Sequence, residues 1–201
     1  MRRLLLLVMV LLSLAIVENA SSQILMDENF NYPAGDSLGA HGWVSFSGGN
    51  TNVLSVSTPG LLYTGYLLSN IGNSARVVRT GQDAYRQFSG NGDSTGNVYV
   101  TFMVRVDSSA AAGDYFFALL PDNSTSNYTG RIYVKDTLSG FKFGIAKATS
   151  PIVYTPDSYS FGITYLLVIK YSFVNGTNND EVNLFVFSGS IPASEPAPTI
   201  G

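Results

Sequence analysis

The chain has 201 residues, of which 45% are hydrophobic and 12% are charged, and its formal net charge is −3 at pH 7. This composition excludes an intrinsically disordered chain, and the acidic balance argues against a surface that binds nucleic acid. The sequence has no cysteine and one histidine, which excludes disulfides, thiolate metal sites, thiol catalysis and any site that needs two imidazoles.

The first 22 residues have the pattern of a signal peptide. Arg2 and Arg3 precede an apolar run over residues 4–17, and Ala20 and Ser22 place small side chains before a cleavage point. The run has 14 residues, whereas a membrane-spanning helix needs about 20. We therefore predict a signal peptide over residues 1–22, a secreted or cell-surface protein, and no membrane insertion after cleavage. The alternative is an uncleaved anchor helix.

Strand signals follow one another along the remaining chain. Short strands are predicted over residues 23–30, 43–46 and 53–57, separated by clusters of turn-forming residues. The clearest signal covers residues 98–106, where Val and Phe alternate with Tyr, Thr, Met and Arg, as in a strand with one buried face. Further strands are predicted over residues 115–120, 131–135, 141–145, 165–173 and 181–187, the last two joined by a hairpin loop.

This succession predicts an all-β fold, a two-sheet antiparallel β-sandwich or jelly roll. Residues 23–190 are predicted to form one domain by their length. Residues 191–201 contain three prolines and have the composition of a linker or long loop. An open alternative is that the closing strand of the sandwich is missing and the chain is a fragment of a longer protein.

Several segments carry a resemblance to a known family. ENFNYPAGDSL at residues 28–38, followed by HGW at residues 41–43, resembles the opening of bacterial concanavalin A-like (laminin-G-like) jelly-roll domains. GDYFF at 113–117, RIYVK at 131–135, YLLVIKY at 165–171 and NDEVNLFV at 179–186 fit the same pattern. The resemblance implies a jelly roll in an exported protein associated with type IX secretion. Relatives of this fold include lectins, glycan-binding modules, adhesin parts and glucanases, so the fold does not choose a function.

The carboxylates favour a protein without catalytic activity. Glucanases place two carboxylates across one groove, and the laminarinase-like members of the fold carry Glu-x-Asp-x-x-Glu on one strand, a run that is missing here. The mature chain has three glutamates, and these are expected at a strand end (Glu28), at a hairpin end (Glu181) and in the Pro-rich tail (Glu195). His41 lies between Ala40 and Gly42, outside any nucleophile motif. We therefore predict no catalytic residue.

A structural calcium ion is the one cofactor left open. Calcium is held by carboxylate and carbonyl oxygens, and many jelly rolls of this type hold one ion. Asp27 and Asp180, the latter in a loop with two asparagines, are the candidate ligands. The alternative is that both belong to polar loops without a metal.

Aromatic and cationic side chains provide the candidate ligand-binding residues. Tyr99 and Arg105 alternate with apolar residues of one strand. The same alternation on another strand places three further candidates, Arg131, Tyr133 and Lys135. If both strands belong to one sheet, the five form a groove in which Tyr133 stacks on a sugar and Arg131 donates to hydroxyls. The alternative is an ordinary solvated sheet face.

Trp43 is the sixth candidate, and it is either a stacking platform or a core anchor. Taken together, the sequence predicts a secreted, non-catalytic module that binds a glycan or cell-surface polysaccharide or supports adhesion. Two alternatives stay open, namely a degenerate or incomplete glycoside hydrolase of the same fold, and a structural spacer domain in a larger surface protein.

Overall fold

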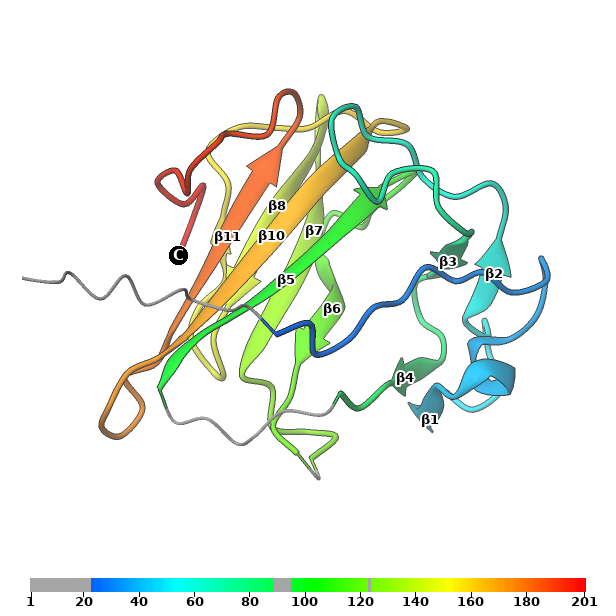
Figure 1. The fold of residues 1–201 in the computed structure, drawn as a ribbon, viewed down its shortest axis with the longest axis horizontal. Coiled ribbons are helices and arrows are strands. Elements are labelled where there is room, and N and C mark those ends of the chain that lie inside the picture. The colour runs from blue at the N-terminus through cyan, green and yellow to red at the C-terminus, as the bar shows by residue number, and fades with distance from the viewer. Residues whose placement is uncertain (1–22, 89–94, 123) are drawn as a thin grey trace, which may run out of the picture.

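The computed structural model describes residues 23–88, 95–122 and 124–201 (Figure 1). The predicted signal peptide, residues 1–22, lies outside the described residues. Those described form eleven β-strands and one short 3-10 helix, η1 (Leu38–His41). Within the described ranges, no helix has the length and apolar character that a membrane crossing requires. The prediction of an all-β fold is therefore confirmed.

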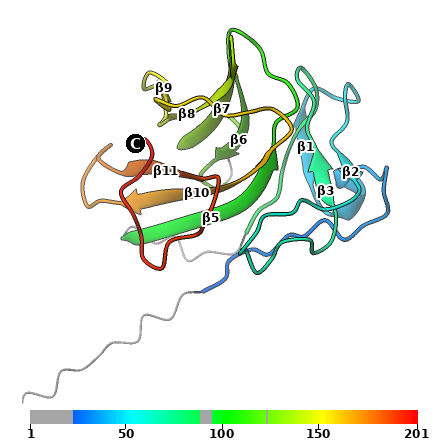
Figure 2. The same ribbon diagram turned by 90° about the horizontal axis from the view of Figure 1, so that it is seen from above.

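Two antiparallel sheets make up the body of the molecule, as the two layers in Figure 2 show. The three-stranded sheet has the order β11–β10–β5, and the four-stranded sheet has the order β6–β7–β8–β9. Their bounds are β5 (Gly96–Arg105), β6 (Asp114–Leu119), β7 (Gly130–Thr137), β8 (Gly140–Ala146), β9 (Val153–Tyr154), β10 (Thr164–Phe173) and β11 (Glu181–Phe187).

The core lies between these two sheets, and alternation along the strands builds it. On β5, Val100, Phe102 and Val104 pack on the core, whereas Tyr99 and Arg105 lie on the exposed side. Both sheets contribute fully buried side chains, because every second residue of each strand faces the other layer. The buried cluster comprises Val106, Ile132, Phe141, Phe143, Ile145, Tyr165, Leu167, Ile169, Tyr171, Val182, Leu184 and Ile200.

A second region, residues 23–88, packs at the side of the sandwich (Figures 1 and 2). We call it the ribbon region, because its regular structure consists of two two-stranded ribbons. β1 (Val44–Ser47) pairs with β4 (Asp83–Tyr85), and β2 (Ser55–Ser57) pairs with β3 (Ser74–Arg76). Its buried cluster is small and comprises Leu38, Leu54 and Val56.

The strand predicted over residues 23–30 is wrong, since this segment forms no regular structure. Ile24, which would face a core in such a strand, is 80% exposed. Phe30 has a positive φ of 51°, a conformation incompatible with an extended strand. The Phe30 amide donates instead to Glu28 Oε1 at 2.8 Å, so the side chain of Glu28 organises this turn.

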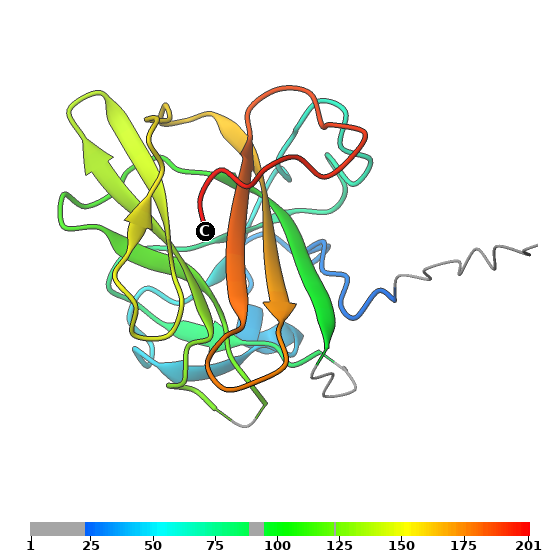
Figure 3. The ribbon, with the colours of Figure 1, turned by 90° about the vertical axis from the view of Figure 1, so that its left-hand side faces the viewer.

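The Pro-rich segment after β11 runs across the outer face of β11 and β10 and then returns to β11 (Figure 3). We call residues 188–201 the tail. At its far end, the Leu184 amide donates to the Ile200 carbonyl at 2.8 Å, and the Thr199 amide donates to the Leu184 carbonyl at 2.9 Å. These bonds form an isolated bridge on the side of β11 away from β10 and bury Ile200 to 9% exposure.

Candidate functional site

The six ligand-binding candidates do not share one surface. Tyr99 and Arg105 lie on β5 in the three-stranded sheet, whereas the other three strand candidates lie on β7 in the four-stranded sheet. The expected single groove is therefore not formed, because the two polar faces point away from each other on opposite sides of the sandwich. Arg105 makes a two-bond ion pair with Asp107, at 2.9 and 3.0 Å.

The outer face of the four-stranded sheet carries a row of tyrosines. One cross-strand row runs over all four strands. Tyr115 on β6 lies opposite Tyr133 on β7, and Tyr133 lies opposite Gly144 on β8. Gly144 in turn lies opposite Tyr154 on β9. Residues opposite one another in antiparallel strands point to the same face. Tyr128 from the β6–β7 connection joins them. We call Tyr115, Tyr128, Tyr133 and Tyr154 the tyrosine layer.

Ring contacts and one hydroxyl pair connect three members of this layer. The Tyr115 and Tyr128 ring centroids are 5.5 Å apart, and their hydroxyl oxygens lie at a hydrogen-bond distance of 3.2 Å. Tyr115 and Tyr133 meet edge to face with centroids 6.1 Å apart. Such aromatic pairs stabilise a surface beyond the area that they bury, so the rings are held in fixed orientations.

Two cations pack on the tyrosine layer. The Arg131 guanidinium carbon lies 5.1 Å from the ring centroid of Tyr128 and 5.6 Å from that of Tyr133, and Lys135 Nζ lies 5.2 Å from the ring centroid of Tyr154. These distances are those of cation–π contacts. Arg131 Nη2 also donates to the Ala148 carbonyl at 2.7 Å. The cations therefore hold the rings and add positive charge to the face.

Gly144 allows Tyr154 to lie against the sheet. A Cβ atom at this position would be 2.8 Å from two carbons of the Tyr154 ring. At Gly113, just before β6, a Cβ atom would be 2.5 Å from the Tyr154 hydroxyl. The ring therefore spans the space that two glycines leave open, which is a recurring use of glycine in strands and turns.

Burial divides the tyrosine layer into a support and a surface. Tyr133 is 7% exposed, so it supports its neighbours, and the expected stacking of its ring on a sugar is incompatible with this position. Tyr115, Tyr128 and Tyr154 are partly exposed. Burial raises the pKa values of Tyr115, Tyr133 and Tyr154, and for Tyr115 the hydroxyl of Tyr128 adds to the effect. A phenol of ordinary pKa is already uncharged at neutral pH, and these shifts extend the uncharged range to more alkaline pH, so the three hydroxyls keep the protons needed to donate hydrogen bonds.

Three members of the layer were absent from the sequence-based candidates. Tyr115 lies in a run of apolar residues, Tyr128 lies in a connection without periodicity, and Tyr154 lies in a strand of two residues. Gly144 was the available signal, because an isolated glycine inside a strand pattern marks a close approach by another group. Register was the missing information, since it alone places the rings in one row.

Trp43 lies in the ribbon region, partly buried against its small apolar cluster. Its ring packs beside Phe30 with centroids 6.0 Å apart, and its Nε1 donates to Glu28 Oε2 at 3.4 Å. The same carboxylate accepts a bond from Tyr32 and forms an ion pair with Arg86. The Glu28 side chain is only 9% exposed, and its bonds connect three segments of this region, those of residues 28–32, Trp43 and Arg86.

The two calcium candidates do not form a common site. Asp180 accepts hydrogen bonds from the Tyr171 hydroxyl at 2.7 Å and from the Val174 amide at 2.9 Å, so each carboxylate oxygen already has a donor. These two bonds, led by that of Val174, lower the pKa of Asp180. Asp27 is exposed on the segment before the ribbons. Among the described residues, no group of three His, Asp or Glu side chains gathers around one point.

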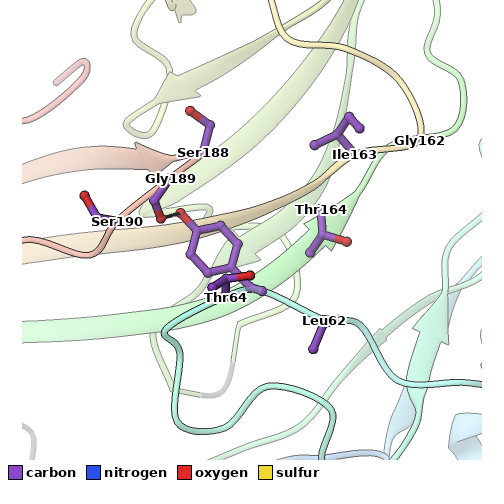
Figure 4. Close-up of a pocket in the computed structure, with 9 residues that line it drawn as sticks. Leu62, Thr64, Gly162, Ile163, Thr164, Ser188, Gly189 and Ser190 are labelled. Atoms are coloured by element: carbon purple, nitrogen blue, oxygen red, sulfur yellow. Dashed lines mark hydrogen bonds between the residues drawn. The ribbon is translucent and has the colours of Figure 1, made fainter.

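A pocket of about 600 Å³ opens at one end of the three-stranded sheet (Figure 4). Three segments line it, namely residues 62–64, 162–164 and 188–190. Tyr63 donates from its hydroxyl to the Gly189 carbonyl at 2.7 Å and so ties the ribbon region to the tail. Among the described residues that line it, hydroxyl groups predominate and no Asp, Glu, Lys, Arg or His side chain is present.

Comparisons with protein-family models, with curated proteins and with solved structures find no match to this chain. The resemblance to concanavalin A-like jelly rolls therefore stays a prediction, and so does the jelly-roll connectivity.

Proposed function

We propose that this chain is an exported, non-catalytic β-sandwich module that binds carbohydrate, with the tyrosine layer as its contact surface. The observation that carries the proposal is the row of tyrosine rings on one sheet face, oriented by Arg131 and Lys135. The predicted signal peptide supports export. The resemblance to concanavalin A-like domains supports the same class of ligand.

The chemistry of the layer suits a sugar. A sugar ring offers C–H groups on its faces and hydroxyl groups at its edges, so it packs on an aromatic ring while its edges take fixed donors. Tyr115 and Tyr154 provide partly exposed rings with protonated hydroxyls, and Arg131 provides a planar group of donors. Because the cations and neighbouring rings fix these side chains, binding costs little side-chain entropy.

The positions of the glutamates support a function without catalysis. Glu28 is engaged with Arg86 in the ribbon region, and Glu195 is engaged with Lys170 on the three-stranded sheet. Glu181 lies at the first position of β11. Glu28 is thus remote from the other two, whereas Glu181 and Glu195 both lie on the outer face of the three-stranded sheet. Glycoside hydrolysis needs one carboxyl group of raised pKa opposite a second carboxylate, and the hydrogen bonds from Lys170 and Tyr99 lower the pKa of Glu195 instead.

The test is a binding measurement on the purified full chain with a panel of immobilised polysaccharides. We expect wild type to bind a subset of the panel, and Tyr128→Ala and Arg131→Ala each to weaken that binding about tenfold, the loss of one aromatic contact or charge-assisted bond. Tyr85→Ala is the matched control, since it removes a tyrosine that is 38% exposed on β4. Circular dichroism checks that each variant is folded.

Three results would contradict the proposal. Equal binding by wild type, Tyr128→Ala and Arg131→Ala would place the site elsewhere. Binding to none of the polymers would favour the spacer alternative. Release of reducing sugar that disappears in Glu181→Gln would instead favour a hydrolase.

A further inference from the structure

The tail places one carboxylate on the outer face of the three-stranded sheet. Glu195 Oε1 accepts a bond from Lys170 Nζ at 2.7 Å, and Glu195 Oε2 accepts a bond from the Tyr99 hydroxyl at 2.7 Å. Each oxygen therefore has its own donor, and the two donors come from different strands. Hydrogen bonds to an ionised carboxylate are shorter and stronger than those between neutral groups.

The sheet builds this pair of donors independently of the tail. Lys170 on β10 lies directly opposite Tyr99 on β5 in the antiparallel register, so both side chains leave the same face side by side. Lys170 Nζ lies 5.6 Å from the Tyr99 ring centroid, within cation–π range. The donors are thus fixed by backbone pairing and by their mutual contact, and Glu195 is the part that can leave.

The tail is held weakly around Glu195. Residues 188–198 are all exposed. Within the described part of the chain, the tail is bonded to the rest of the protein at Gly189, at Thr199 and Ile200, and between these points through Glu195 alone. The Glu195 side chain is 45% exposed and the Lys170 side chain 21%, so solvent and salt screen the ion pair in part. A ligand carboxylate that takes over the same two donors replaces the bonds of Glu195 with bonds of the same kind.

We propose that Tyr99 and Lys170 form a binding site for the carboxylate of an acidic sugar, and that Glu195 occupies this site until a uronate displaces it. The inference rests on the proposed carbohydrate-binding function and adds a second surface with a stated ligand class. It concerns the opposite side of the sandwich from the tyrosine layer.

A uronate fits the site better than a simple carboxylate. Its carboxyl group is attached to a sugar ring, and Tyr99, which is 49% exposed, provides an aromatic face for that ring. Asn183 lies opposite Lys170 on β11, and Thr101 lies two residues along β5 on the same face. Their amide and hydroxyl groups are of the kind that binds sugar hydroxyls.

The experiment measures the affinity of the full chain for sodium polygalacturonate by calorimetry, with dextran as the neutral polymer. Removing the competing carboxylate with Glu195→Gln is expected to raise the affinity for polygalacturonate roughly three- to tenfold, because the open site becomes the dominant state. Lys170→Ala and Tyr99→Phe are each expected to lower the affinity by a similar factor. Neither effect is expected with dextran.

Asp157→Asn is the matched control, because it removes one negative charge from an exposed residue of the β9–β10 connection. If Asp157→Asn raises the affinity as much as Glu195→Gln, the gain comes from net charge and the proposal is overturned. It is also overturned if Lys170→Ala and Tyr99→Phe, both folded by circular dichroism, bind polygalacturonate like wild type.

The two proposals fail separately. If only Tyr128→Ala and Arg131→Ala weaken binding, the tyrosine layer stands and the carboxylate site fails. If only the Tyr99, Lys170 and Glu195 variants change binding, the carboxylate site stands and the tyrosine layer fails as a surface. If neither wild type nor Glu195→Gln binds any polymer, both fail.

Discussion

The sandwich and the ribbon region are held together in different ways. The sandwich has long strands. Its β5 (residues 96–105) and β10 (residues 164–173) pair along all ten of their residues. Its buried side chains come from facing sheets and touch one another throughout. The ribbon region has strands of three or four residues and a buried cluster of three. Its segments meet instead around the carboxylate of Glu28.

This difference shows what a chain does where apolar alternation is too short to build a core. In the ribbon region, one shielded carboxylate takes donors from Tyr32, Trp43 and Arg86, and so joins segments far apart in the sequence. A buried ionic group of this kind is costly unless all its donors are present. The stability of the ribbon region should therefore depend on single polar groups, and the stability of the sandwich on the packing of apolar side chains.

The largest effect is expected from a core truncation in the sandwich. Phe143 is fully buried, with ring centroids 4.9 Å from Phe141 and 5.0 Å from Tyr159. Phe143→Ala leaves a cavity between the sheets and should lower the free energy of unfolding by about 3–5 kcal/mol. Urea denaturation followed by far-ultraviolet circular dichroism measures this loss.

Leu54→Ala in the ribbon region is the companion variant, since Leu54 is 8% exposed in the small cluster. We expect a smaller loss of about 2 kcal/mol, at the low end for such truncations. If Leu54→Ala lowered the free energy of unfolding as much as Phe143→Ala, this would contradict the view that packing stabilises the sandwich and polar contacts stabilise the ribbon region.

A second experiment removes the charge at the centre of the ribbon region. Glu28→Gln keeps the size of the side chain but ends the ion pair with Arg86, and it should cost about 2 kcal/mol, as for a hydrogen bond to a charged group. Trp43 is the only tryptophan and donates to this carboxylate, so its fluorescence reports on the ribbon region. We expect the fluorescence transition in urea to move to lower concentration than the circular dichroism transition. Coincident transitions in the variant would mean that the two regions unfold as one unit.

The last experiment tests how the sandwich responds to alkali. Burial and the hydrogen bond to Asp180 raise the pKa of Tyr171 to about 12, and burial also raises the pKa values of Tyr99, Tyr115, Tyr133, Tyr154 and Tyr159 in the sandwich. A phenol whose pKa is higher in the folded state stabilises the fold below its ordinary pKa. That contribution is lost as the pH rises through the folded value.

For Tyr171, the loss should fall between pH 10 and 12. Tyr171→Phe removes the hydroxyl whose proton is held in the folded state and lost in the unfolded state over this range. The fall of the unfolding free energy with pH should therefore become less steep, by about 1.4 kcal/mol per pH unit. The readout is chemical denaturation at several pH values in this range. An unchanged slope would show that Tyr171 ionises alike in the folded and unfolded chains.

The sequence was most informative where alternation is long. Residues 98–106 predicted β5 and its inward valines, because a period of two over nine residues leaves one arrangement of faces. The strands near residues 165–173 and 181–187 were also predicted and are confirmed as β10 and β11. Strands as short as β3, β4 and β9 carry two or three residues each, too few for any period to be visible.

The candidate surfaces depend on information that a single strand does not contain. Arg131 and Lys135 were expected to face outward, but which residues would lie beside them depends on strand order and register. Tyr99 was grouped with them because the sequence does not say which strands share a sheet. Its actual neighbours, Lys170 and the distant Glu195, are brought to it by pairing and by the course of the tail.

Gly144 also bears on how such a surface changes during evolution. A single methyl group at this position would collide with the ring of Tyr154 and would tilt it away from the sheet, although no aromatic or charged residue had been replaced. The shape of the tyrosine layer is therefore encoded partly in a residue that adds no side chain to it. A change from glycine to alanine on β8 would alter the shape of this face in one step, with the same set of aromatic side chains.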